Sequence, residues 1–272
     1  MRFLICFILL YGQITSSFGQ ITPPISLREV VPLPNAHAHN DYEHPRPLWD
    51  ALARGFTSIE ADVYLINDTL FVSHYRPKAL LLTRTLEEMY LKPLQHLSQS
   101  QQGRIYPHYD GVFYLMIDFK TEAESTYKAL EKLLLQYQEL LSFYQNHRYF
   151  RRAVTVFISG NRPVETLRRS AYRQAALDGR PSDLGQGFDN DLMPIVSDTY
   201  WKYSTWKGDG PLPDESFERL QQLAQAVHQE GKKLRLWATP ENPVVWQKLR
   251  EAGVDFINTD QLEMAKAFLL KN

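Results

Sequence analysis

Short apolar runs and longer amphipathic segments alternate along the chain from residue 30 to the C-terminus. The apolar runs have strand lengths and are rich in β-branched and aromatic residues. They span residues 30–39, 58–66, 112–120, 153–159, 172–177, 194–197, 233–239 and 255–258, with a short extended return at 70–74. The amphipathic segments have apolar residues at helical spacing and span residues 46–54, 85–98, 122–145, 213–229, 243–252 and 261–270.

About eight strands that alternate with helices predict parallel βα units. The count favours an α/β fold of the (β/α)8 TIM-barrel type, in one domain over residues 20–272. An open doubly wound sheet would show a similar alternation, but no glycine-rich phosphate or dinucleotide motif follows the first strand.

Polar or aromatic pairs, two positions apart, occur near the C-terminal ends of four predicted strands. These pairs are His37 and His39, Glu60 and Asp62, Asp118 and Lys120, and Arg235 and Trp237. Successive side chains of a strand point to opposite faces, so both members of each pair share a face. The C-terminal ends of barrel strands meet at one mouth, where active sites of this architecture lie. The pairs therefore predict a site at that mouth.

Residue types indicate the chemistry of this site. Glu60, Asp62 and Asp118 would supply three oxygen ligands, which suit Mg2+ or Ca2+ better than Zn2+. A hard cation flanked by Lys120 and Arg235 suits an anionic phosphate ester. The predicted function is a metal-dependent phosphodiester hydrolase, and the predicted partner is a small-molecule or lipid phosphodiester.

Two histidines are candidates for proton transfer. His39 comes from the end of the first strand, and His74 follows the short return after the carboxylate strand. Two histidines on opposite sides of a metal can act as general base and general acid, since their ordinary pKa lies near working pH.

Composition narrows the class of partner. Hydrophobic residues make up 44% of the 272 residues, as in a globular protein with a substantial core. The formal net charge of −1 gives no reason to expect nucleic acid or an anionic membrane surface as partner.

The N-terminus has the pattern of a secretory signal. A basic start, an apolar run and a small polar stretch span residues 1–19, with cleavage expected near Gly19. A membrane-anchoring or buried N-terminal helix is the alternative. Cys6 is the only cysteine and lies in this run, so the mature chain would form no disulfide. We expect a secreted or periplasmic protein without a transmembrane anchor, because no later segment is apolar for long enough to span a bilayer.

Several motifs resemble those of one known family. They are His37-Ala-His-Asn-Asp-Tyr42, Pro47-Leu48, Ser58-Ile-Glu-Ala-Asp62, Arg84-Thr-Leu86, Tyr90-Leu-Lys-Pro-Leu94, Ala176-Leu-Asp-Gly-Arg180, Trp237-Ala-Thr-Pro240 and Ile257-Asn-Thr-Asp260. Together, from about residue 35 to the C-terminus, they are similar to the altered-inheritance-of-mitochondria family of the phospholipase C-like (PLC-like) phosphodiesterases.

The resemblance implies a PLC-like TIM barrel that hydrolyses phosphodiesters, as in the glycerophosphodiester phosphodiesterases and the spider-venom phospholipases D. By this similarity the site residues are, for catalysis, His39 and His74; for the metal, Glu60, Asp62 and Asp118; and for substrate, Lys120 and Trp237. In those relatives a substrate hydroxyl attacks phosphorus first and gives a cyclic phosphate.

This sequence departs from the glycerophosphodiesterase motifs at two places, and these departures bear on the glycerol specificity rather than on the phosphodiester chemistry. His39-Asn40-Asp41 stands where the glycerophosphodiesterases have His-Arg-Gly, and Tyr75 follows the second histidine where Asp is usual. We expect His37, Asn40 and Asp41 to orient His39 or to contact the substrate.

Two other functions fit part of the pattern. His37 and His39 are also typical of zinc amidohydrolases and of the polymerase-histidinol-phosphatase family. Those enzymes need further histidines at later strand ends, and residues 172–177 and 194–197 contain none. A non-catalytic barrel that binds a phosphorylated ligand would not need both histidines and all three carboxylates.

An aromatic cluster lies in a late loop, residues 199–208. Its members are Tyr200, Trp201, Tyr203 and Trp206. The cluster either lines the mouth for a lipid or sugar, or packs the loop onto the barrel.

Overall fold

The computed structural model describes residues 25–146 and 148–271. The predicted signal segment, with Cys6, lies outside these residues, so the secreted or periplasmic location stays a prediction. Within the described residues, no helix combines the length and the apolar character needed to cross a bilayer.

Eight parallel strands follow one another around the molecule in the order of the sequence. They are β1 (Leu33–Ala38), β2 (Phe56–Ile66), β4 (Phe113–Phe119), β7 (Val154–Gly160), β9 (Ala175–Gly179), β10 (Ile195–Thr199), β11 (Lys233–Trp237) and β12 (Ile257–Thr259). β12 pairs with β1, and a parallel bridge between Arg235 and Phe256 joins β11 to the residue before β12. The pairing confirms the predicted (β/α)8 barrel.

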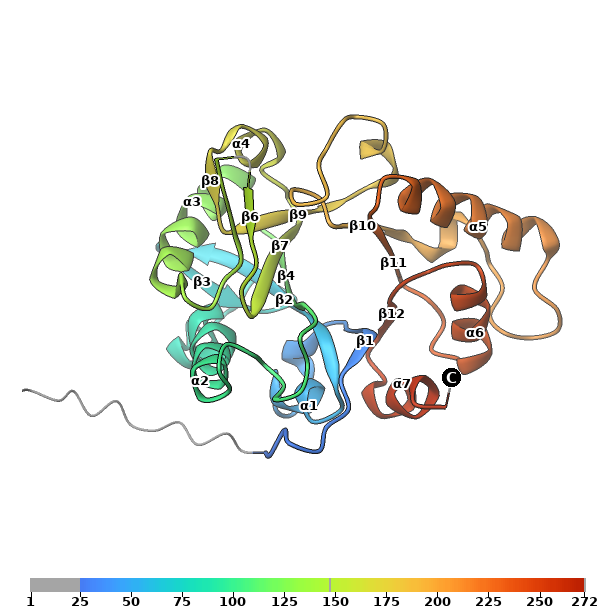
Figure 1. The fold of residues 1–272 in the computed structure, drawn as a ribbon, viewed down its shortest axis with the longest axis horizontal. Helices are drawn as coiled ribbons and strands as arrows, with labels where there is room; N and C mark the ends of the chain where they lie inside the picture. The colour runs from blue at the N-terminus through green and yellow to red at the C-terminus, as the bar shows by residue number, and fades with distance from the viewer. Residues whose placement is uncertain (1–24, 147, 272) are drawn as a thin grey trace, which may run out of the picture.

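Helices surround the strands (Figure 1). They are α1 (Trp49–Leu52), η3 (Glu87–Leu91), α2 (Lys92–Ser100), α3 (Ala123–Leu134), α4 (Val164–Arg169), α5 (Asp214–Gln229), α6 (Pro243–Glu251) and α7 (Leu262–Leu269). No α-helix lies between β9 and β10, whose connecting residues 180–194 all belong to the described part of the chain. The connection contains the 3-10 turn η5 (Pro181–Asp183). The predicted return after β2 is β3 (Thr69–Val72), which forms an antiparallel hairpin with β2.

The predicted helix over residues 122–145 is wrong in its last part. The helix α3 ends at Leu134, and the chain then enters the strand β5 (Phe143–Gln145). β5 pairs with β6 (Arg148–Phe150) and β8 (Tyr172–Arg173) in a small antiparallel sheet, and the ring of Phe143 stacks on that of Phe150. The leucine spacing was misleading because Leu141 is buried through a bridge to Val154 at the start of β7, not through a continued helix.

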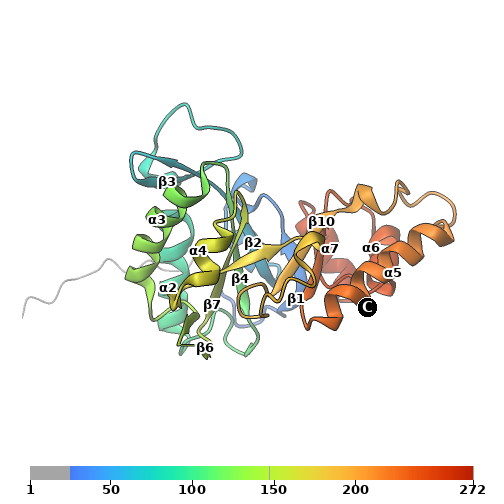
Figure 2. The same ribbon diagram turned by 90° about the horizontal axis from the view of Figure 1, so that it is seen from above.

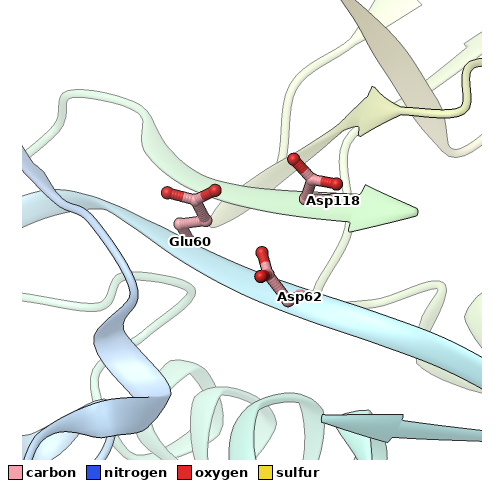
Figure 3. A group of neighbouring side chains, drawn as sticks. All are labelled: Glu60, Asp62 and Asp118. Carbon is pink, nitrogen blue, oxygen red and sulfur yellow. The ribbon is translucent and has the colours of Figure 1, made fainter. Parts of the chain in front are cut away.

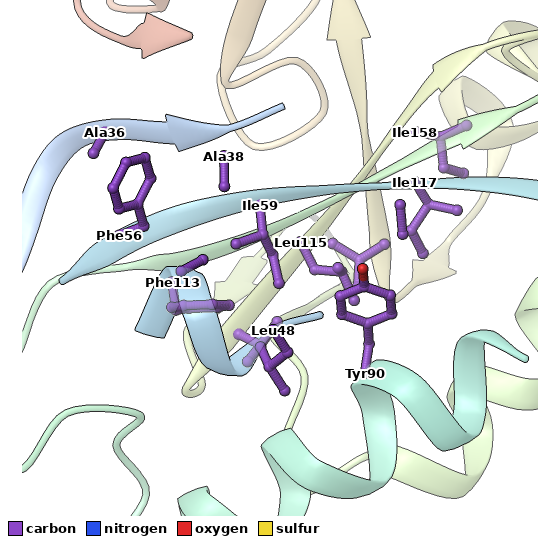
Figure 4. Packing of buried hydrophobic residues seen from close by; sticks show 14 of the residues in the cluster. Ala36, Ala38, Leu48, Phe56, Ile59, Tyr90, Phe113, Leu115, Ile117 and Ile158 are labelled. Carbon is purple, nitrogen blue, oxygen red and sulfur yellow. The ribbon is translucent and has the colours of Figure 1, made fainter. Parts of the chain in front are cut away.

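Alternation along the strands creates two different interiors. Inside the barrel, Tyr114, Met116 and Phe157 belong to a small apolar cluster. On the opposite face of the strands, Ile59 and Leu115 are among the residues that pack against the surrounding helical layer (Figure 4). Two residues beyond Met116 the inward position of β4 is Asp118, so the apolar interior gives way to polar groups toward the C-terminal ends of the strands.

Candidate metal and catalytic site

Three carboxylates from two adjacent strands lie together near the C-terminal ends of those strands. Glu60 and Asp62 are inward residues of β2, and Asp62 is directly opposite Asp118 of β4 in the strand register. One oxygen from each residue can be chosen so that all three lie within 4.8 Å of one another. Figure 3 shows the three side chains grouped over the neighbouring strands. The three residues predicted as metal ligands are therefore brought together.

Lys120 is the cation closest to this cluster. Its Nζ lies 3.0 Å from Oδ2 of Asp62 and 3.2 Å from Oδ1 of Asp118. Oε2 of Glu60 and Oδ1 of Asp62 are buried and have no hydrogen-bond partner among the described residues. Buried carboxylate oxygens without partners are costly, and oxygen donors of this kind are the ligands of hard divalent cations. The cluster fits such an ion.

The charges of the cluster shift the pKa values of its members. Burial, together with the charge of Glu60, raises the pKa of Asp118 to about 6, against the opposing effect of Lys120. Burial and the charge of Glu60 also raise the pKa of Asp62. Burial alone would raise the pKa of Glu60, but the adjacent His37 ring, 3.7 Å away, and the nearby cationic groups lower it to about 2. In the metal-free site, two of the three carboxyls thus hold protons more tightly than usual.

His39 lies on one side of the cluster and is held by an acidic residue. Its Nδ1 is 2.8 Å from Oδ1 of Asp260, and its Nε2 is 3.8 Å from Oε2 of Glu60. Burial lowers the pKa of His39, but the hydrogen bond to Asp260 and the charges of Glu60 and Asp260 outweigh it and raise the pKa. We did not predict Asp260 as a site residue, although it lies two positions after Asn258 and the i, i+2 rule could have identified it.

His74 lies beside the carboxylate of Asp62. Its Nδ1 is 3.2 Å from Oδ2 of Asp62 and 3.2 Å from the hydroxyl of Tyr42. The Tyr42 hydroxyl is 2.6 Å from the same Asp62 oxygen and 2.7 Å from Oδ1 of Asn40. Asn40, which adopts a left-handed backbone conformation with φ of 46°, thus contacts the site through Tyr42. Tyr42 was missed as a site residue because an aromatic side chain is more typical of core packing than of a catalytic site.

His37 and Arg235 lie inside the barrel instead of at its mouth. Nδ1 of His37 is 2.7 Å from the hydroxyl of Ser58, and its Nε2 is 3.7 Å from Oε2 of Glu60. Burial lowers the pKa of His37 to about 4. Arg235 donates to the Asn258 side chain at 2.7 Å and is almost wholly buried. Arg235 was expected to flank the cation beside an anionic substrate, and His37 to orient His39 or to contact the substrate; both side chains are almost wholly buried.

A second polar cluster, centred on Asp178 of β9, was not predicted. Oδ2 of Asp178 accepts hydrogen bonds from Ser159 at 2.8 Å and Arg180 at 2.7 Å, and it lies 3.4 Å from Nη2 of Arg235. Its other oxygen accepts from Ser197. Burial alone would raise the pKa of Asp178, but Arg235 and Arg180 hold it below its usual range. We refer to Asp178, Ser159, Ser197, Arg180 and Arg235 as the Asp178 network.

Asp41 and Trp237 have different surroundings from those of the carboxylates. Asp41 is wholly buried and accepts hydrogen bonds from the Leu48 amide at 2.6 Å and the Tyr90 hydroxyl at 2.9 Å. It therefore holds the turn before α1, outside the cluster, and this position gives no support to a substrate contact. Trp237, the last residue of β11, is 41% exposed, and its predicted contact with substrate stays a prediction.

The predicted aromatic cluster of residues 199–208 is mostly packed. The hydroxyl of Tyr200 donates to the Trp206 carbonyl at 2.8 Å, and that of Tyr203 donates to Asp198 at 2.8 Å. Trp201 is 42% exposed. The loop is thus fixed by its own hydrogen bonds and leaves one large aromatic side chain at the surface.

The pair of His37 and His39 does not belong to a cluster of potential metal ligands. Within residues 25–146 and 148–271, the cluster of at least three residues that could hold a metal ion consists of Glu60, Asp62 and Asp118. A zinc centre based on His37 and His39 would need further ligands close to both rings.

Comparison with known proteins gives one family. Residues 25–178 match the family model described as the AIM6-like phosphodiesterase domain. The Altered inheritance of mitochondria protein 6 homolog of Arthroderma benhamiae is 31% identical over 89% of this chain and 85% of its own length. Altered inheritance of mitochondria protein 6 of Eremothecium gossypii is 32% identical over 92% of this chain and 73% of its own.

Among solved structures, the phosphatidylinositol-specific phospholipase C from Listeria monocytogenes is similar to this chain with a TM-score of 0.48. The sequence identity is 12%, and the match covers 89% of this chain and 95% of that one.

Proposed function

The chain belongs to the AIM6-like phosphodiesterase family, and from this premise we propose that it is a metal-dependent phosphodiester hydrolase. The observation that carries the proposal is the carboxylate cluster of Glu60, Asp62 and Asp118, with its unpartnered buried oxygens, between His39 and His74. Each histidine also has one ring nitrogen next to a carboxylate. This is the arrangement needed to bind a phosphate and move two protons.

Glu60, Asp62 and Asp118 would hold the cation, and their oxygens suit Mg2+ or Ca2+. When bound, a hard cation of this kind supplies positive charge that attracts and polarises a phosphodiester. Lys120 adds a fixed positive charge beside two of the carboxylates, where it can contact an anionic oxygen of the substrate.

The two histidines would perform the proton transfers. One takes the proton from the attacking hydroxyl as its oxygen forms a bond to phosphorus, and the other gives a proton to the alcohol oxygen whose bond to phosphorus breaks. Asp260 favours the tautomer of His39 that carries its proton on Nδ1, which leaves Nε2 to face the site. Asp62 and the Tyr42 hydroxyl hold His74 by its Nδ1 in the same way.

We propose glycerophosphodiesters or phospholipids as the substrate class, with Trp237 at the mouth as a further contact. Attack by water would yield a phosphomonoester, and attack by a substrate hydroxyl would yield a cyclic phosphate. The predicted signal at residues 1–19 would place this activity outside the cytoplasm.

The test is hydrolysis of bis-p-nitrophenyl phosphate, glycerophosphocholine and lysophosphatidylcholine with Mg2+, with Ca2+ and with a chelator. We expect metal-dependent turnover that His39→Ala abolishes, and phosphorus NMR of the product separates the cyclic phosphate from the monoester. A folded chain that binds metal but turns over none of the three diesters would favour a non-catalytic binding barrel. Stoichiometric zinc on His37 and His39 would favour the amidohydrolase-type alternative.

A further inference from the structure

Residues 75–84, which we call the apical loop, expose a run of large apolar side chains. The loop follows β3 and includes the 3-10 turn η2 (Leu82–Arg84). Leu80, Leu81 and Leu82 are 44%, 54% and 73% exposed, and Tyr75 is 77% exposed. Scattered exposed leucines are ordinary, but a contiguous exposed apolar patch is typical of a surface that binds something.

The charged residues of the apical loop are all basic. They are Arg76, Lys78 and Arg84, and no acidic residue occurs from residue 75 to residue 86. Arg84 donates a hydrogen bond to the Tyr42 carbonyl, whereas Arg76 and Lys78 form no ion pair with any described residue. The whole chain has a formal net charge of −1, so the positive charge of the apical loop is a local feature that the net charge of the chain does not reveal.

The apical loop is joined directly to the candidate site. It begins one residue after His74, and the ring of Tyr75 meets that of His74 edge-on at 4.7 Å between centroids. Its two ends are fixed, because the Ser73 amide donates to the Asp62 carbonyl and a bridge joins Phe71 to Thr85. Figure 2 shows the teal segment after β3 projecting beyond the barrel. Contact between this loop and a surface would therefore bring that surface to the site.

Two exposed tryptophans belong to the same end of the barrel. Trp237 is the last residue of β11, and Trp201 lies two residues after the end of β10. They are 41% and 42% exposed. Tryptophan is enriched where proteins meet the boundary between water and lipid headgroups.

We propose that the apical loop docks the protein on a phospholipid bilayer that carries anionic lipids. Leu81 and Leu82 enter the boundary between headgroups and acyl chains, and Arg76 and Lys78 meet the negative headgroups. Docking itself is independent of turnover. Only its consequence, that the site draws its phosphodiester from the membrane, rests on the proposed function.

A second copy of the chain is a less suitable occupant of the same surface. A two-fold interface places the same patch on both partners. Arg76 and Lys78 of one copy would then face the same cations of the other, with no acidic residue in the loop to separate them.

The test labels the loop and measures its environment on vesicles, in the presence of chelator so that no lipid is consumed. Leu81→Cys in a Cys6→Ser background carries a polarity-sensitive fluorophore, because Cys6 is the only native cysteine. Leu135→Cys is the matched control, since Leu135 is 45% exposed at the far end of α3. The vesicles are phosphatidylcholine alone or phosphatidylcholine mixed with phosphatidylserine.

We expect a blue shift of the Leu81 label, but not of the Leu135 label, on the mixed vesicles, and a smaller shift as salt increases. Arg76→Gln with Lys78→Gln should weaken binding by roughly 25-fold, at about fivefold for each cation. Leu82→Ser should also weaken binding and leave turnover of bis-p-nitrophenyl phosphate unchanged.

Three results would overturn the proposal. The first is an unshifted Leu81 label on a folded protein, and the second is equal binding to neutral and mixed vesicles. The third is self-association in solution that Leu82→Ser disrupts, which would make the loop an interface between copies. Absence of turnover on every diester would count against the proposed function and leave the docking result standing.

Discussion

Asp178 on β9 and the carboxylates of Glu60, Asp62 and Asp118 on β2 and β4 lie inside the same barrel, but their charges are balanced differently. Asp178 has two guanidinium groups and two serine hydroxyls around it, and its pKa is held below the usual range. Among the three carboxylates, Asp62 and Asp118 share the single ammonium of Lys120, and their pKa values are raised. One buried oxygen of Glu60 and one of Asp62 have no hydrogen-bond partner among the described residues.

The difference separates a structural cluster from a functional one. A buried acid that the protein itself neutralises contributes to the stability of the fold and has no capacity left for a ligand. A buried acidic cluster that is short of positive charge is stabilised when a cation binds. Each of the following experiments perturbs one region and uses the other as its reference.

The largest expected effect is on turnover. His39→Ala or His74→Ala should lower the rate of diester hydrolysis by about 1000-fold, because each removes a proton-transfer group. Far-UV circular dichroism and thermal melting should be unchanged. His228→Ala is the matched control, since His228 is also paired with an aspartate, Asp255, at 2.8 Å but lies on α5. Wild-type rates in either site variant would remove that histidine from the mechanism.

The next effect is on folding. Asp178→Asn should lower the free energy of unfolding by about 3 kcal/mol, because it leaves the buried guanidinium of Arg235 without its anionic partner. Asp118→Asn should weaken metal binding and leave the metal-free protein as stable as the wild type, or more so, because it relieves repulsion. Urea unfolding and metal titration of both variants measure the contrast. A loss of stability that is equal in the two variants would contradict the distinction between the regions.

The two regions should also respond oppositely to pH in chelator. The pKa of Asp118 is about 6 in the folded, metal-free protein against 3.8 ordinarily, so between these values the folded state holds a proton that the unfolded state has lost. Its contribution to stability is therefore full below pH 3.8 and is lost as pH rises through 6, by at most about 3 kcal/mol. The lowered pKa of Asp178 acts in the other direction: its contribution is present above its unfolded pKa and is lost on acidification.

Urea unfolding of the metal-free protein at a series of pH values measures both slopes. Asp118→Asn should flatten the decline between about pH 4 and pH 6, and Asp178→Asn should reduce the loss at acid pH. An unchanged pH profile in Asp118→Asn would show that this carboxyl is ionised normally.

The smallest effect concerns the glycine that makes room for Asp118. Gly160, at the end of β7, has φ of +67°, and a Cβ there would lie 2.3 Å from Oδ1 of Asp118. Gly160→Ala should displace that carboxylate and weaken metal binding by roughly tenfold, because losses of this size are typical when a residue that orients a metal ligand is changed. Gly103→Ala is the control, because Gly103 also has a positive φ but no atom within 4 Å of the added Cβ. Equal metal affinity in the two variants would show that Gly160 does not position Asp118.

Most of the barrel and the carboxylate cluster could be predicted from local pattern. Strand alternation is a property of a few consecutive residues, so Glu60 and Asp62 were identified as neighbours on one face, and Asp118 was expected at an equivalent place on another strand. The end of α3 could not be predicted, because Leu140 and Leu141 continue the helical spacing while their burial depends on β7. Asp178 and Asp260 were missed as site residues, although Asp178 stands two positions before Arg180 and Asp260 two positions after Asn258, the same spacing as in the polar pairs that were identified.

The sequence by itself determined the order of strands and helices, the inward face of each strand and the candidate ligands, since all of these follow from short-range periodicity and residue type. Only the tertiary structure decided which acid each cation neutralises. Lys120 and Arg235 both occupy cationic positions in the polar pairs at strand ends, yet Lys120 lies between Asp62 and Asp118 while Arg235 joins the Asp178 network. Partner choice depends on how closely strands distant in sequence approach one another, and closure of the barrel sets those distances.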